Sequence, residues 1–98
     1  MRVGTILHAE IFAEAKNPAY KLQIDFGPLG VKKSSAQITK FYQPEALIGK
    51  QIIAVVNFPA KQIGPFMSEC LVLGAVDDDK GVILLNPSLN CENGLRIA

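Results

Sequence analysis

The segment from Tyr20 to Phe26 alternates apolar and polar side chains, and this period of two constrains the fold more than any other feature. Tyr20, Leu22, Ile24 and Phe26 fall on one face, while the polar residues between them fall on the other. Such alternation is typical of a β-strand that is buried on one side and solvated on the other. The chain therefore needs partner strands that cover the apolar face.

Other short segments also have the composition of strands. The run from Val3 to Phe12 predicts a first strand, in which Gly4 admits a bend or a bulge. The run from Gln51 to Phe58 is apolar on both faces, which is typical of a strand packed on two sides. Further pairing is predicted at residues 32–38, 69–76, 82–86 and 95–97.

Helical structure is sparse. Pro44 begins a Pro-Glu-Ala-Leu segment that predicts one short helical turn ending at Gly49, and no long amphipathic helix is found. Turn signals separate short strands along the chain, which favours a small closed barrel over an α/β fold. The predicted fold class is all-β: one domain over residues 1–98, a five-stranded OB-fold barrel with short helical segments. A small β-sandwich is the alternative.

Composition adds a prediction about assembly. Of the residues in the chain, 49% are hydrophobic and only 19% are charged. This fraction of charged residues is low for a small monomeric protein. Several strands are apolar on both faces, whereas a small barrel needs only its inner face apolar. We expect a second copy to cover the spare apolar surface and form a homodimer.

Catalysis, metal binding and cofactor binding are poorly supported. His8 is the single histidine, and the sequence has no nucleophile elbow, phosphate-cradling glycine loop or zinc-ligand spacing. The acidic residues 77–79 predict a solvated turn. Two cysteines, Cys70 and Cys91, predict a reducing cytoplasmic setting, with Cys70 as a buried small hydrophobe. No apolar run has membrane-spanning length and no signal-peptide pattern is found, so membrane insertion is not expected.

A run of lysines, serines and glutamine that begins at Lys32 predicts a binding surface. Read as a strand, Lys33, Ser35 and Gln37 point to one face, while small or apolar residues point to the other. The polar face can donate hydrogen bonds to phosphates, ribose hydroxyls or peptide carbonyls. We expect Lys32, Lys33 and Lys61 to converge, although an ordinary solvated edge is the alternative.

A second candidate patch follows the end of the apolar strand. Phe66 and Met67 come after Gly-Pro in a loop, where large apolar groups are costly unless they pack or bind. Aromatic faces stack on bases, and methionine suits contacts with varied peptides. The alternative is that both side chains fold back onto the barrel or the dimer seam. The patch comprises Asn57, Lys61, Phe66, Met67, Ser68 and Glu69.

The motifs of these two patches resemble CsaA, a family of secretion-associated chaperones. KKSSAQITKFY, QIIAVVNFP and KQIGPFMSECLVLG fit its pattern, as do RVGTILHAEIF, NPAYKLQIDFG and NGLRI, so the resemblance covers nearly the whole chain. CsaA is similar to the tRNA-binding domains appended to methionyl-tRNA and phenylalanyl-tRNA synthetases and to the endothelial monocyte-activating polypeptide.

The resemblance implies an OB barrel in a two-fold homodimer. Because no nucleotide site is visible in the sequence, we expect the protein to work without ATP or another cofactor. The resemblance also implies binding of unfolded or pre-secretory polypeptides, or alternatively structure-specific tRNA binding through the same cleft, in which case the two ligands compete.

Three departures from the family pattern stand out: the family usually has a segment before Arg-Val-Gly-Thr, many relatives have a basic residue where Gln62 stands, and Cys70 replaces an aliphatic residue. The implied ligand positions are Lys32, Lys33, Ser35, Gln37, Asn57, Lys61, Ser68 and Glu69, with Phe66 and Met67 near the peptide-binding cavity.

Overall fold

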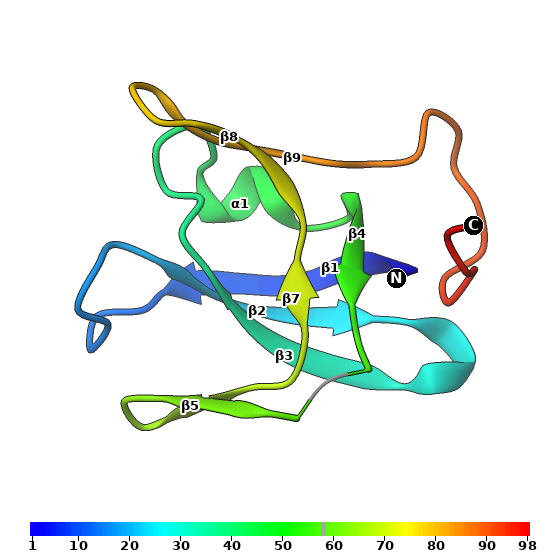
Figure 1. The fold of residues 1–98 in the computed structure, drawn as a ribbon, viewed down its shortest axis with the longest axis horizontal. Helices are drawn as coiled ribbons and strands as arrows, with labels where there is room; N and C mark the ends of the chain where they lie inside the picture. Colours follow the sequence, from blue (N-terminus) through cyan, green and yellow to red (C-terminus); the bar gives the residue numbers. More distant parts are fainter. Residues whose placement is uncertain (58) are drawn as a thin grey trace.

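Five strands form one sheet that curls into a nearly closed barrel (Figure 1). The structure is a computed structural model that describes residues 1–57 and 59–98. The order in the sheet is β3-β2-β1-β4-β7, and every pair of neighbours is antiparallel. The predicted all-β, five-stranded barrel is therefore confirmed. The strands are β1 (Arg2–Ile11), β2 (Tyr20–Asp25), β3 (Val31–Ala36), β4 (Gln51–Val55) and β7 (Leu71–Val72).

Two hairpins and two short helical segments complete the fold. The predicted helical turn is confirmed as α1 (Pro44–Leu47), and its fully buried Leu47 joins the barrel core. In Figure 1, α1 lies between the barrel and the β8–β9 hairpin. The other elements are the 3-10 helix η1 (Gly27–Leu29) and the hairpins β5–β6 (Lys61–Ile63, Phe66–Ser68) and β8–β9 (Gly74–Asp77, Gly81–Leu84).

The alternation from Tyr20 to Phe26 becomes the core face of β2. Tyr20, Leu22, Ile24 and Phe26 are at most 5% exposed, as the sequence predicts. The Tyr20 hydroxyl donates to the Tyr42 carbonyl oxygen at 2.7 Å, so the one polar tip on this face is satisfied. The core is completed from the neighbouring strands and from α1, chiefly by Ile6, Ala9, Ile38, Leu47, Ile52, Ala54 and Cys70.

Gly4 does not form the bulge of β1. The register of β1 against β2 shifts between Ile6 and His8, so the irregularity lies further along the strand. A Cβ at Gly4 would stand 2.6 Å from Ile24 Cγ2 and 2.7 Å from Phe26 Cε1. Gly4 is therefore required for the close approach of the Phe26 ring to the backbone of β1.

The two ends of the chain are joined by backbone hydrogen bonds. The Val3 amide donates to the Leu95 carbonyl oxygen at 3.0 Å, and the Gly94 amide donates to the Val3 carbonyl oxygen at 2.7 Å. A β-bridge between Arg2 and Arg96 confirms the predicted pairing of the last segment. Figure 1 shows the two termini on the same side of the barrel.

Other predictions can be compared with the described residues. The predicted strand 51–58 ends at Val55, and its last residue, Phe58, lies outside the described part of the chain. The acidic turn is confirmed, because Asp77 Oδ1 accepts the amides of Asp79 and Lys80. Among the described helices, none has the length and apolar composition needed to cross a membrane.

Candidate functional site

The two predicted patches lie side by side. The Glu69 amide donates to the Lys33 carbonyl oxygen at 2.7 Å, and the Lys33 amide donates to Glu69 Oε1 at 2.9 Å. The Ser35 amide donates to Ser68 Oγ at 3.3 Å. We call this junction of β3 with the segment after β6 the seam. It brings the serine-rich strand against the β5–β6 hairpin, as Figure 1 shows.

The side-chain polar groups of Ser68 and Glu69 form hydrogen bonds with other residues of the chain. Ser68 is 6% exposed, and its hydroxyl also donates to the Cys70 carbonyl oxygen at 3.3 Å. The hydroxyl of Ser34, which is fully buried, donates to the same carbonyl at 2.9 Å. These contacts close the barrel on the β3 side. They give Ser68 and Glu69 a structural role at the seam.

Phe66 packs onto the barrel instead of extending from a loop tip. Its ring meets the Phe12 ring edge-on, with centroids 5.4 Å apart. Lys33 Nζ lies 5.4 Å from the Phe66 centroid, and Lys21 Nζ lies 5.7 Å from it, which are cation–π distances. Met67 is 39% exposed and remains available to a ligand.

Lys21 is a surface cation that the sequence reasoning missed. It lies opposite Ser35 in the β2–β3 ladder, and its Nζ sits 5.0 Å from the Phe12 centroid. The alternation of β2 already placed Lys21 on the polar face of that strand. Only the pairing of β2 with β3 shows that this face continues the face of Lys33 and Ser35.

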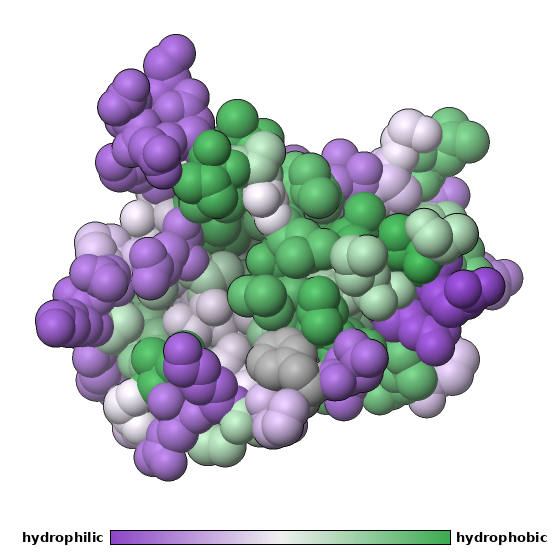
Figure 2. All heavy atoms as spheres, in the orientation of Figure 1, coloured by the Kyte–Doolittle hydropathy of each residue, from purple (hydrophilic) through white to green (hydrophobic). Residues whose placement is uncertain are grey.

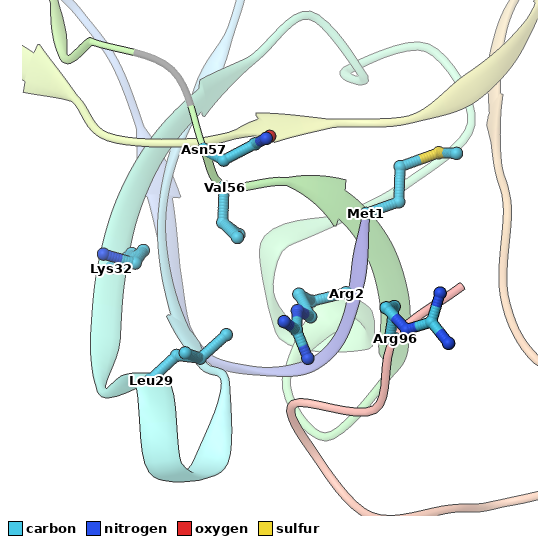
Figure 3. A pocket seen from close by; sticks show the side chains of 7 residues that line it. All are labelled: Met1, Arg2, Leu29, Lys32, Val56, Asn57 and Arg96. Atoms are coloured by element: carbon cyan, nitrogen blue, oxygen red, sulfur yellow. The ribbon is translucent and has the colours of Figure 1, made fainter. Parts of the chain in front are cut away.

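Lys32 and Asn57 line a pocket at the end of the barrel near the chain termini. Figure 3 shows this pocket, whose volume is about 420 Å³, with Arg2 between Lys32 and Arg96. Lys33, one residue later in β3, instead faces the Phe66 ring. The structure therefore separates Lys32 from Lys33. We call this hollow the cationic pocket; its lining residues are Met1, Arg2, Leu29, Lys32, Val56, Asn57 and Arg96.

Ser35 and Gln37 line a groove of about 350 Å³ between β3 and the β7–β8 segment. Past the seam, no backbone hydrogen bond among the described residues joins β3 to β7. Apolar residues form most of the groove, which combines a polar strand edge with apolar walls. We call it the β3–β7 groove; its other lining residues are Ala36, Ile38, Leu71, Val72, Leu73, Gly74, Val76 and Val82.

The remaining predicted residues can now be placed. Lys61 is exposed on β5, where it pairs with Ser68 across the hairpin. The ten predicted site residues thus occupy the seam with its hairpin, the cationic pocket and the β3–β7 groove. Lys32, Lys33 and Lys61 do not line one common pocket among the described residues.

Cys70 is a buried thiol in the core behind the seam, as predicted. Burial raises the pKa of the Cys70 thiol to about 11, while the nearby Ser34 hydroxyl acts in the opposite direction. A thiol with a raised pKa is protonated and inert at neutral pH. Within the described part of the chain, no group of three or more histidine, cysteine or acidic residues is arranged to hold a metal ion.

Comparison with known proteins places the chain in a family. The profile of a family described as "Putative tRNA binding domain" matches residues 1–96. The chain belongs to this tRNA-binding domain family. The match spans the whole barrel and also includes the segment that joins the two chain ends.

Within the tRNA-binding domain family, the chain is similar to solved CsaA chaperones. It is 58% identical to CsaA of Bacillus anthracis, covering 99% of this chain and 88% of that one, with a TM-score of 0.94. It is 57% identical to CsaA of Picrophilus torridus, covering 99% and 89%, with a TM-score of 0.93. The expected resemblance to CsaA is therefore confirmed.

The tRNA-binding domain family also links the chain to methionine–tRNA ligases. The ligase of Methanococcoides burtonii is 37% identical over 99% of this chain, and that of Thiobacillus denitrificans is 32% identical over 99%. The chain spans only 14% and 15% of the length of these two ligases. The similarity is therefore to one domain-sized part of these ligases, and the family profile describes this part as a tRNA-binding domain.

Proposed function

We propose that the chain is a CsaA-type chaperone that binds unfolded or pre-secretory polypeptides without ATP. The observation that carries this proposal is the β3–β7 groove, which combines a polar strand edge with apolar walls. The similarity to the CsaA chaperones, at 57–58% identity, supports the same function. The free thiols of Cys70 and Cys91 fit action in the reducing cytoplasm.

The groove suits an extended chain. The backbone groups of Lys33 point away from β2, toward Glu69, and by alternation those of Ser35 point the same way. The Ser35 amide already donates to Ser68 Oγ, so its carbonyl oxygen is the group that this edge offers to a client. An unfolded segment can add its own backbone hydrogen bonds to this edge without any sequence requirement. Leu71 and Val72 then receive its apolar side chains.

Binding of a permanently unfolded polypeptide, such as reduced and carboxymethylated α-lactalbumin, tests the proposal. The protein is expected to bind it saturably in the absence of nucleotide. Leu71→Ser should weaken binding, since Leu71 is 53% exposed in the groove wall. Leu7→Ser is the matched control, because Leu7 is 46% exposed on β1 and lines neither the groove nor the cationic pocket. Equal loss in both variants would contradict the proposal.

A homodimer is part of this proposal. Figure 2 shows apolar residues gathered on the face formed by β4, β7, β8 and β9. On the last of these strands and just after it, Ile83 and Leu85 are 48% and 42% exposed. Exposed apolar surface of this kind marks an interaction site. Two copies would present two grooves, so one client held at both sites would bind more tightly than at either.

tRNA binding is the second candidate function. The family profile favours it, and so does the cationic pocket, which Arg2, Lys32 and Arg96 line without an acidic lining residue in the described chain. Phosphate contacts make binding fall steeply with salt. A fluorescence titration with tRNA from low to physiological salt therefore tests it. Absent or salt-independent binding would remove this candidate.

A further inference from the structure

We propose that the cationic pocket binds a phosphate group of an RNA backbone through Lys32, Arg96 and Arg2. This inference rests on the second candidate function and assigns a place for one phosphate. Arg2 and Arg96 are not among the residues that the sequence indicated. They reach the pocket because the β-bridge between them pairs the two chain ends at this end of the barrel.

The three cations lack acidic partners in the part of the chain that the structure describes. The ion pair found there joins Lys21 to Glu14, on another surface, at 3.9 Å. None of the described residues that line the pocket is acidic. Three like charges around one hollow repel each other, so an anion that enters relieves this repulsion as well as gaining hydrogen bonds.

Arg2 is held in position before any ligand arrives. Its Nη1 donates to the Gly94 carbonyl oxygen at 3.1 Å, and the side chain is half-buried. Guanidinium groups bind phosphate through two parallel hydrogen bonds, and fixing one such group in advance lowers the entropy lost on binding. Figure 3 shows the Arg2 side chain between Lys32 and Arg96, so the held guanidinium lies on the pocket lining between the two other cationic residues.

The rest of the lining fits a nucleotide unit better than a free ion. Leu29 and Val56 form an apolar wall beside the cations, and the Asn57 amide offers both a donor and an acceptor. A volume of about 420 Å³ leaves room for a sugar or base next to the phosphate. The Leu29 side chain is 42% exposed, so a ligand that covers it buries apolar surface.

The pocket shares no lining residue with the β3–β7 groove. RNA held in the pocket therefore leaves Ser35, Gln37 and Leu71 free for an unfolded polypeptide. The neighbouring residues Lys32 and Lys33 point to different surfaces, so their substitutions are expected to have different effects. Substitution of Lys32 is expected to weaken RNA binding, whereas substitution of Lys33 removes a cation from the Phe66 ring and leaves the pocket lining unchanged.

The first arm of the test uses inorganic phosphate and amide NMR spectra. Saturable shifts are expected at Leu29, Lys32 and Asn57, and they should be lost in Lys32→Ala combined with Arg96→Ala. Lys16→Ala is the matched control, because Lys16 is an exposed cation outside the pocket. Acetate at equal ionic strength tests a carboxylate instead. Equal shifts with acetate, or phosphate shifts that do not saturate, would overturn the proposal.

The second arm measures tRNA affinity against salt concentration in the same variants. The double variant is expected to bind more weakly, with a slope of log K against log salt that is shallower by about 0.7 to 0.9 for one lost phosphate. The Lys16→Ala control should keep the wild-type slope. If wild type binds tRNA and the double variant binds equally well, the pocket proposal fails while tRNA binding stands. If wild type does not bind tRNA, RNA is excluded as the source of the phosphate and the second candidate function fails.

Discussion

Lys33 and Glu69 exchange two hydrogen bonds across the seam, one through the Glu69 amide at 2.7 Å and one through Glu69 Oε1 at 2.9 Å. Glu69→Ala removes the second bond and is expected to lower the free energy of unfolding by about 1 kcal/mol. Glu69→Gln keeps an oxygen acceptor and should lose less. Urea unfolding gives the stabilities, and hydrogen exchange should show faster exchange of the Lys33 amide in the alanine variant only. Equal stability of Glu69→Ala and wild type would show that this bond contributes nothing.

Gly4→Ala is expected to destabilise the barrel by about 2–3 kcal/mol. The new methyl group would overlap the Phe26 ring and Ile24 Cγ2, and overpacking of a core has costs of this size. Gly30→Ala is a useful comparison, because a Cβ at Gly30 meets open space and only the positive φ of 88° opposes it. Thermal or urea unfolding should rank Gly4→Ala as the more destabilised variant. The reverse order would mean that Phe26 can move aside at little cost.

The stability of the protein should fall between about pH 9 and pH 11 because of Cys70. The pKa of this thiol is about 11 in the folded protein, against 9.0 for an ordinary cysteine. Below pH 9 both states keep the proton, whereas above it only the unfolded state releases it, which favours unfolding. Urea unfolding curves recorded from pH 8 to pH 10.5 give the free energy of unfolding at each pH. This free energy should fall by about 1–2 kcal/mol more for wild type than for Cys70→Val. Parallel profiles would contradict a raised pKa.

Phe66 and Met67 should respond differently to truncation. Phe66→Ala removes the edge-on contact with Phe12 and is expected to reduce stability by about 1–2 kcal/mol as well as weakening polypeptide binding. Met67→Ala should weaken polypeptide binding with little change in stability, because the side chain is 39% exposed. Unfolding curves and polypeptide titrations on both variants separate the two effects. Unchanged binding in the double variant would remove the hairpin from the client site.

The homodimer proposal predicts a change in molecular mass. Ile83→Lys combined with Leu85→Lys places two charges at exposed apolar positions on β9 and just after it, and should convert a dimer into monomers. Ile48→Lys is the matched control, because Ile48 is equally accessible, at 52% exposure, but follows α1. Sedimentation velocity measures the masses. A wild-type protein that sediments as a monomer at micromolar concentration would refute the dimer.

The barrel could be predicted from local patterns because its strands carry their own periodicity. Tyr20 to Phe26 and the proline at residue 44 each determine local structure, and the structure confirms both. The role of Gly4 was only partly predictable. A glycine in a strand signals either a bulge or a close approach, and only the packing of Phe26 decides between them.

The site was harder to predict, because it depends on pairing between distant segments. Adjacent residues in a strand point to opposite faces, so Lys32 and Lys33 could not share a surface once β3 was formed. Sequence reasoning applied that rule to Lys33, Ser35 and Gln37 but still grouped Lys32 with them. Arg2 and Arg96 were missed, since nothing in their local sequence shows that the two chain ends meet.

The joined ends of the chain make the barrel a candidate for circular permutation. The Ile97 amide donates to the Met1 carbonyl oxygen at 3.0 Å, so a linker of a few residues can connect Ala98 to Met1 without crossing the barrel. New ends opened in the exposed turn at Asp78 would interrupt none of the five strands of the sheet. Such a rearranged chain would keep both arginines of the cationic pocket on one continuous segment, with Arg2 still at the start of β1.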